Sequence, residues 1–240
     1  MRILSRQVNA ETNMPKQLSV KANMLWNSAG SMVYLACQWA ITIVVVRLST
    51  GFDDAGLLSL AMSVVGIFST FANYKMGTYQ VSDIRHENTV GEYMSFRILT
   101  LTVSFAICMI YAFCTCSAYA LITIALFYAF KAVGLLIDIL HAVDQINRRM
   151  DYMGISFMLQ GTLTFAAFVA VFWLSQNLNL AIFAMILAVL AVLFMFDLPR
   201  CQQFERVCLG LSWRRALFFL RVSFPAVVAS VAASAIFTIP

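Results

Sequence analysis

Seven long apolar segments, separated by short polar loops, constrain this chain more than any other feature of its sequence. An α-helix needs roughly 20 apolar residues to cross the ~30 Å hydrocarbon core of a bilayer. Of the 240 residues, 62% are hydrophobic and only 11% are charged, whereas soluble domains carry about 25% charged residues. A single core cannot bury that much apolar surface, so the sequence predicts a protein whose solvent is lipid. The expected segments are Asn27–Leu48, Gly56–Asn73, Phe96–Phe113, Ala118–Leu140, Met153–Leu174, Leu178–Phe196 and Ala216–Ile239.

The predicted fold is an all-α polytopic membrane protein, with a six-helix bundle followed by a seventh helix. We expect an N-terminal segment at residues 1–26, a transmembrane bundle at 27–197, a polar loop at 198–215 and a last transmembrane helix at 216–240. The last apolar segment runs to Pro240 with no polar anchor after it. We therefore expect this chain to be the front portion of a longer transporter, followed by a second lobe.

The distribution of Lys and Arg predicts the orientation of the helices. These residues occur at the N-terminus and in or beside the second, fourth and sixth loops, whereas the first, third and fifth loops hold none. By the positive-inside rule, the N-terminus and the even-numbered loops are cytoplasmic. The net charge of +5 therefore indicates a lipid bilayer as partner, not nucleic acid. The cations are Arg2, Arg6, Lys16, Lys21, Lys75, Arg85, Arg97, Arg148, Arg149, Arg200, Arg206, Arg214 and Arg215.

The six cysteines give no sign of a metal site or a disulfide framework. Cys37 and Cys108 lie inside apolar segments, where cysteine acts as a small hydrophobic residue. Cys114 and Cys116 flank a single threonine, and no CxxC pair or His-rich companion occurs. We expect neither a metal nor another cofactor.

The segment Ala118–Leu140 is apolar but carries two charges, Lys131 and Asp138. A charge near the middle of a membrane helix costs about 2.5–3.5 kcal/mol on insertion scales. Residues seven apart share one face of a helix, but the two are about 10 Å apart along the axis, too far for an easy direct pair. Tyr128 lies near the same face. The pattern predicts that this face borders a polar interior.

Two interpretations stay open for each deep or terminal cation. Lys131 is either a cavity cation that attracts a pyrophosphate group or the partner of an acid on a neighbouring helix. Arg47 either grips a phosphate or sugar near the outer mouth, or has a structural role, in which it reaches the interface or pairs with Asp53 and Asp54.

Asp138 and the residues near it have similar alternatives. Asp138 either takes part in coupling to a proton or sodium ion, or neutralises Arg148 or a neighbouring helix. His141 follows one turn later and either titrates near neutral pH or is a solvated loop histidine. Gly154 and Gly161 share one face and are expected to allow close helix packing.

Four stretches resemble the polysaccharide flippases, the Wzx or polysaccharide transporter family of the MOP superfamily. In Val46–Ala61 an Arg-Leu pair closes the first helix, an acidic loop follows, and Gly-Leu and Leu-Ala pairs open the second. Tyr79–Asp83, Asp138–Arg149 and Arg221–Pro225 are similar to the end of the second helix, an inner helix end and the start of the seventh helix. The family has two similar helical halves, so the resemblance implies that this chain is the first half plus the seventh helix.

The resemblance also implies a function and a location. A flippase of this family moves a polyprenyl-pyrophosphate-linked oligosaccharide from the inner to the outer leaflet of the bacterial cytoplasmic membrane, by alternating access. Lys131, Arg47 and Tyr128 are then the candidate substrate-binding residues, and Asp138 is the candidate coupling residue.

Two other function classes give different expectations. A drug or cation exporter of the same superfamily favours acidic residues in the cavity over a deep lysine. A membrane-embedded glycosyl or acyl transferase needs paired acids, a histidine or a metal site in a loop or cavity. The predicted outer loops are short and contain no histidine, and no HExxH, P-loop or GxSxG motif occurs. The sequence therefore favours a transporter over an enzyme.

Overall fold

The computed structural model describes residues 17–49, 53–83 and 87–238, and every regular element in those ranges is a helix. The protein is thus an all-α polytopic membrane protein, as the apolar segments predict. Its elements are α2 (Val20–Leu48), α3 (Asp53–Asn73), α4 (Met76–Ser82), α5 (Val90–Thr115), α6 (Ala118–Ile146), α7 (Met150–Ser175), α8 (Leu178–Val192), the π-helix η1 (Leu193–Asp197), α9 (Leu198–Cys201) and α10 (Trp213–Thr238).

Six helical stretches are long and apolar enough to cross a membrane. They are Val20–Leu48, Asp53–Ser82, Val90–Thr115, Ala118–Ile146, Met150–Ser175 and Leu178–Cys201. These match the first six predicted segments, with ends that differ by several residues. α10 is a single helix of 26 residues but is not among the six, so the seventh crossing stays a prediction.

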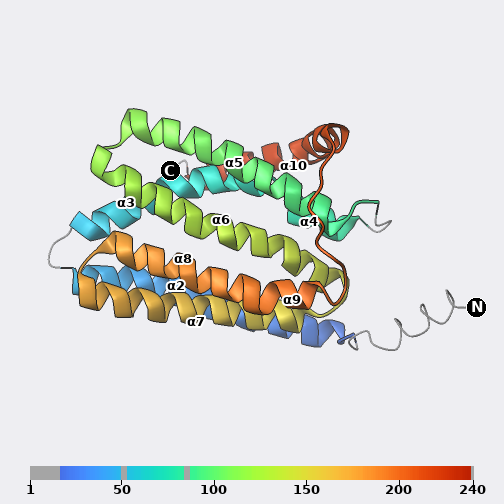
Figure 1. Cartoon of the computed structure of the whole chain (residues 1–240), viewed down its shortest axis with the longest axis horizontal. Coiled ribbons are helices and arrows are strands. Elements are labelled where there is room, and N and C mark those ends of the chain that lie inside the picture. Colours follow the sequence, from blue (N-terminus) through green and yellow to red (C-terminus); the bar gives the residue numbers. More distant parts are fainter. Residues whose placement is uncertain (1–16, 50–52, 84–86, 239–240) are drawn as a thin grey trace, which may run out of the picture.

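α6 is the central helix of the bundle (Figure 1). On one side it packs against α3, α4 and α5, and on the other side against α7, α8, η1 and α9. α2 packs mainly on α7, away from α3, although α2 and α3 are consecutive in sequence. The six spans therefore form two groups of helices, which meet along α6.

Small residues allow α2 and α7 to approach closely, as predicted for Gly154 and Gly161. A Cβ atom added at Gly154 would lie 2.4 Å from the carbonyl oxygen of Trp26, and one at Gly30 would lie 2.4 Å from the carbonyl oxygen of Gly154. A Cβ at Gly161 would lie 2.9 Å from the Cα of Tyr34. Glycine is required here because backbone faces backbone.

The helices extend further into the predicted loops than the hydropathy suggests. α6 continues to Ile146 and α7 begins at Met150, so most of the loop expected at 141–152 is helical. α5 begins at Val90 because Thr89 and Glu92 form a capping box, in which each side chain accepts a hydrogen bond from the other residue's backbone N–H. Polar residues within these added turns are consequently part of the bundle.

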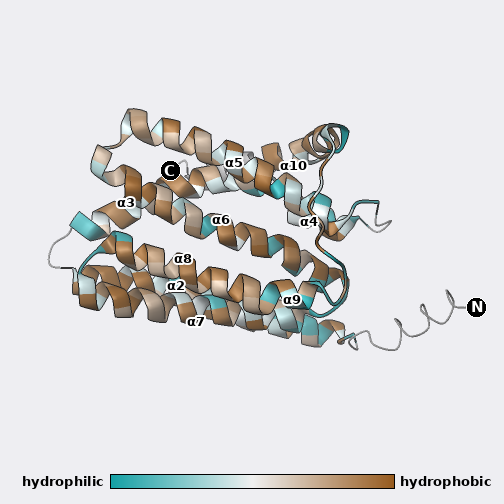
Figure 2. Ribbon diagram, viewed as in Figure 1, coloured by the Kyte–Doolittle hydropathy of each residue, from teal (hydrophilic) through white to brown (hydrophobic). Residues whose placement is uncertain are grey.

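Hydrophilic residues gather at one end of the bundle, which we call the α4 end because it contains α4, α9 and the connection between α9 and α10 (Figure 2). The described parts of the three loops predicted to be basic lie at this end (Figure 1). Apolar side chains such as Trp39 and Trp173, 67% and 69% exposed, cover the outer surface of the helices. Among the predicted loop cations, Arg2, Arg6, Lys16 and Arg85 lie outside the described residues.

Candidate functional site

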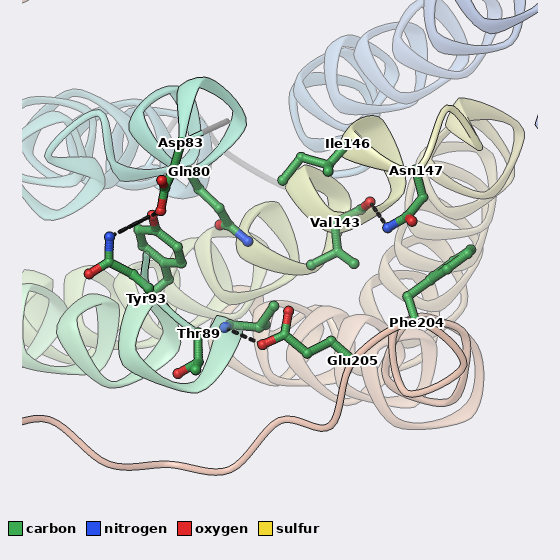
Figure 3. Close-up of a pocket in the computed structure, with 11 residues that line it drawn as sticks. Gln80, Asp83, Thr89, Tyr93, Val143, Ile146, Asn147, Phe204 and Glu205 are labelled. Carbon is green, nitrogen blue, oxygen red and sulfur yellow. Dashed lines mark hydrogen bonds between the residues drawn. The ribbon is translucent and has the colours of Figure 1, made fainter. Parts of the chain in front are cut away.

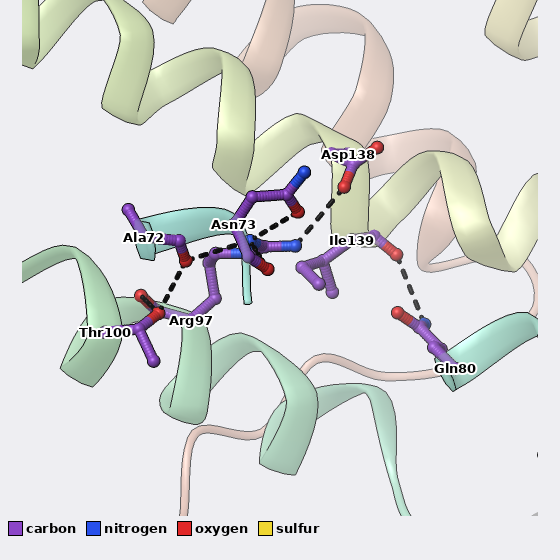
Figure 4. A network of polar contacts seen from close by, with 7 residues as sticks. All are labelled: Ala72, Asn73, Gln80, Arg97, Thr100, Asp138 and Ile139. Atoms are coloured by element: carbon purple, nitrogen blue, oxygen red, sulfur yellow. Dashed lines mark hydrogen bonds and ion pairs between the residues drawn. The ribbon is translucent and has the colours of Figure 1, made fainter. Parts of the chain in front are cut away.

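The most unusual side chain in the bundle is Arg97, which has no exposed surface. It lies two turns into α5. Its Nη1 donates hydrogen bonds to the carbonyl oxygen of Ala72 at 3.1 Å, to Asn73 Oδ1 at 2.9 Å and to the carbonyl oxygen of Asn73 (Figure 4). These carbonyls end α3 and have no partner within it, because Tyr74 and Lys75 adopt positive φ and break the helix. The guanidinium therefore caps the C-terminus of α3.

Arg97 was expected at the edge of a basic loop, and this expectation is wrong. The hydropathy pattern starts the third segment at Phe96, which places Arg97 at an interface. The capping box at Thr89 starts the helix at Val90, six residues before Phe96, and brings Arg97 into the bundle. That Thr-x-x-Glu pattern is the signal in the sequence that would have revealed it.

Asp138 is the acidic partner of Arg97. The Nη2 of Arg97 lies 3.3 Å from Asp138 Oδ2, and the carboxylate side chain is 44% exposed whereas the arginine side chain is fully buried (Figure 4). Gly77 of α4 lies against the same oxygen, since a Cβ there would be 2.9 Å from Oδ2. The pair neutralises a charge on a neighbouring helix, as one interpretation of Asp138 predicts, with Arg97 as the cation. The role of Asp138 in ion coupling stays a prediction.

The exposed part of Asp138 borders a cavity of about 420 Å³, which we call the polar cavity. The end of α3, the turn that follows it, α4, α6 and one residue of α7 form its wall. Its polar lining residues include Asn73, Lys75, Thr78, Asp138, His141 and Gln145. The cavity thus presents both signs of charge next to a fully buried arginine.

His141 also lines the polar cavity, but it is not a solvated loop residue. It is 2% exposed, and its Nε2 lies 3.4 Å from Asp197 Oδ1 of η1. The extension of α6 to Ile146 is the reason, because it turns the predicted loop position into a helical position that faces α7 and η1.

A second cavity, of about 480 Å³, lies between α4, the start of α5, the end of α6 and the segment after α9 (Figure 3). There Asp83 accepts hydrogen bonds from the Tyr93 hydroxyl at 2.7 Å and from Asn88 Nδ2 at 3.0 Å. Partial burial acts to raise the pKa of Asp83, but these hydrogen bonds outweigh it and hold that pKa below its ordinary value. Glu205 accepts a hydrogen bond from the Val90 N–H at 3.0 Å and so tethers the segment after α9 to α5.

Lys131 lies on α6 with its ammonium 5.6 Å from the ring centroids of both Phe127 and Phe130. It is half-buried, and no acidic partner lies within ion-pair distance of it in the described part of the chain. Lys131 does not line the polar cavity. Its predicted role in binding substrate stays a prediction.

The other two predicted substrate residues lie apart from the polar cavity. Tyr128 is buried, and its hydroxyl donates a 3.0 Å hydrogen bond to the carbonyl oxygen of Leu101 on α5. Arg47 is exposed at the opposite end of the bundle, and the described residues show no ion pair between it and Asp53 or Asp54. Of the four predicted site residues, only Asp138 lines the polar cavity.

Within the described ranges, no group of three His, Cys, Asp or Glu side chains is placed to hold a metal ion. The chain matches no model of a known protein family, no curated protein and no solved structure. The arrangement of the polar cavity is therefore the basis for a functional proposal.

Proposed function

We propose that this protein is a flippase, which moves a polyprenyl-pyrophosphate-linked oligosaccharide from the inner to the outer leaflet of a bacterial cytoplasmic membrane. The product would be used for cell-surface polysaccharide synthesis. In this proposal the protein is a transporter and not an enzyme, and its N-terminus and α4 end face the cytoplasm.

The observation that carries the proposal is the polar cavity beside the buried pair of Arg97 and Asp138. Ionisable groups inside membrane spans are costly, and they mark the pathways of substrates and ions. Lys75 at the cavity wall supplies positive charge, which attracts a pyrophosphate group.

The arrangement of the helices supports a rocking mechanism. The group of α3, α4 and α5 and the group of α2, α7 and α8 meet along α6. Transporters commonly alternate their access by moving one helix bundle against another around a polar site. The lipid tail would stay in the bilayer while the charged head group and the sugar cross inside. Lys131, Arg47 and Tyr128 are proposed to contact the substrate during this passage, and Asp138 to couple it to an ion.

A liposome assay tests the proposal. The complete protein would be reconstituted with a fluorescent polyprenyl-pyrophosphate-linked sugar, and movement between leaflets followed with an impermeant quencher. We expect Lys131→Ala to slow movement by about 10- to 100-fold, the effect of losing one charge-assisted contact. Lys21→Ala, at an exposed lysine of α2, is the matched control and should move the lipid at the wild-type rate.

Three outcomes contradict parts of the proposal. If the folded wild-type protein moves no lipid-linked sugar, the substrate class is wrong. If Lys131→Ala moves it at the wild-type rate, the role of Lys131 is wrong. If the protein releases a chemically altered product, a membrane-embedded transferase replaces the transporter.

A second candidate, a drug or cation exporter of the same superfamily, is favoured by one observation. Asp138 opens to the polar cavity, whereas Lys131 does not line it. A cavity carboxylate suits a cationic substrate. The same liposomes loaded with a cationic dye distinguish the candidates, since an exporter would move the dye and lose this activity in Asp138→Asn.

A further inference from the structure

Three ionisable side chains meet in the interior where α6 packs against η1, and we call them the His-Asp cluster. They are His141 and Asp144 of α6 and Asp197 of η1, exposed by 2%, 3% and 3%. The imidazole Nε2 lies 3.4 Å from Asp197 Oδ1. His141 Nε2, Asp144 Oδ1 and Asp197 Oδ2 are all buried without a hydrogen-bond partner in the described part of the chain.

The surroundings do not neutralise the His-Asp cluster. Arg149 and Asp151, at the start of α7, form a bidentate pair with each other at 2.9 and 2.8 Å, so their charges cancel. Arg200 of α9 stacks on aromatic rings. Asp138, one turn away on α6, pairs with Arg97. α8 contributes no charged residue.

Charge balance then requires protons. With a charged imidazole and two carboxylates, the His-Asp cluster carries one net negative charge, and burying an uncompensated ion is strongly unfavourable. A proton on one of the two carboxylates removes that charge. It also turns one of the unpartnered carboxylate oxygens into a hydrogen-bond donor.

The backbone of η1 positions the acid of this cluster. The N–H of Leu198 bonds to the carbonyl oxygen of Leu193, a π-helical turn, immediately before Pro199, which has no N–H to donate. The wider turn carries the buried Asp197 at its end. Single π-helical turns within α-helices occur frequently at functional sites.

His141 connects the cluster to water. It is the one member of the cluster that lines the polar cavity, and its Nε2 lies 3.4 Å from Asp197 Oδ1. An imidazole can take a proton on one ring nitrogen and release one from the other. The edge of its ring also packs on Phe157 of α7, with 4.8 Å between ring centroids, which fixes its orientation.

We propose that His141, Asp144 and Asp197 form a proton-binding site that is filled from the polar cavity. In the filled state the imidazole is charged, one aspartate is a carboxylic acid and the other is a carboxylate, so the net charge is zero. Release returns one proton through His141 to the cavity and leaves one negative charge. In the proposed transporter, on which this last step rests, that proton is the coupling ion, and it leaves through the polar cavity that Asp138, the proposed coupling residue, also lines.

Infrared difference spectroscopy on the complete protein in lipid tests the site without any transport assay. A step to alkaline pH should remove the carbonyl stretch of a buried carboxylic acid, and the band should shift in D₂O. The double variant Asp144→Asn with Asp197→Asn should lack the band, because asparagine mimics the neutral acid and keeps the fold. The matched control is Asp53→Asn, at an exposed carboxylate of α3, and it should keep the band.

Several results would overturn the site. One is the absence of the band in folded wild-type protein at every pH above about 4, where ordinary carboxyl groups are ionised. Another is its persistence in the double variant. Loss of the band when sodium is added at constant pH would assign the site to a metal cation instead.

A transport arm separates this inference from the proposed function. In the liposome assay, a pH gradient should accelerate movement by the wild-type protein and leave the double variant unaffected. If the band is present but no lipid-linked sugar or dye moves, the proton site stands and the proposed function fails. If the wild-type protein transports without the band, the proposed function stands and the proton site fails.

Discussion

The guanidinium group of Arg97 lies 3.3 Å from the carboxylate of Asp138, and the two residues come from different helices 41 positions apart. The arginine is completely buried and also caps the end of α3, whereas the aspartate is open to the polar cavity. The pair therefore links α3, α5 and α6, and this one ion pair connects the wall of the polar cavity to the buried interior.

A double-mutant cycle measures this link. We expect Asp138→Asn to lower the free energy of unfolding by about 1–3 kcal/mol, at the lower end because the carboxylate is half-exposed. Arg97→Met should cost more, since it also leaves the carbonyl oxygens of Ala72 and Asn73 without a donor. Chemical denaturation in detergent should give a coupling of about 0.5–3 kcal/mol between the two changes.

The control for this cycle pairs Arg97→Met with Asp53→Asn, at an exposed carboxylate of α3. Those two effects should add to within about 0.5 kcal/mol. If the effects of Arg97→Met and Asp138→Asn also added to within about 0.5 kcal/mol, the result would show that the ion pair does not form.

Gly77 should be needed for the position of the Asp138 carboxylate more than for stability. A Cβ at Gly77 meets the end of a flexible side chain at 2.9 Å, which can move aside. We expect Gly77→Ala to change the thermal midpoint little but to displace the carboxylate from Arg97. Asp138→Asn should then cost less in the Gly77→Ala background than in the wild type. Gly134→Ala, where a Cβ meets nothing within 4 Å, should leave the cost of Asp138→Asn unchanged.

At the contact of α2 and α7, an added methyl group has no room. Gly154→Ala places its Cβ 2.4 Å from the backbone oxygen of Trp26, which cannot move without separating the helices. We expect a loss of about 1–3 kcal/mol in the free energy of unfolding, as in other overpacked sites. Gly66→Ala, in α3 with open space around it, should be neutral or stabilise the helix by up to about 1 kcal/mol. Equal melting of the two variants would refute the close contact.

The stability of the connection between α4 and α5 should depend on pH through Asp83. The pKa of Asp83 is lower in the folded protein than in the unfolded chain, so its contribution is present above the unfolded value and is lost as pH falls below about 4. Tyr93→Phe removes the 2.7 Å hydrogen bond and should reduce this loss. Melting curves between about pH 6 and pH 3 would measure the difference. Tyr119→Phe, at an exposed tyrosine, should show the same pH dependence as the wild type. If Tyr93→Phe also matched the wild type, the hydrogen bond from Tyr93 would not be what lowers the pKa of Asp83.

The sequence predicted the helical class and the first six spans, because the length of an apolar run is a local property that lipid imposes directly. It also predicted the packing role of Gly154 and Gly161 from their spacing. It was less successful at helix ends, where polar residues continue the helix. For that reason it assigned both Arg97 and His141 to the wrong environment. Arg97 lies seven residues beyond the first residue of α5, and His141 lies five residues before the last residue of α6.

The sequence by itself therefore determined that this chain is a bundle of membrane-spanning helices with charges inside it. Only the tertiary structure decided which charges meet. Asp138 pairs with Arg97, and His141 approaches Asp197, across 41 and 56 positions of sequence. The break after Asn73, the capped start of α5 and the π-helical turn at Asp197 set how each helix is rotated against α6. Hydrophobic periodicity along one helix has no information about that rotation, because it depends on the surfaces of the helices on both sides.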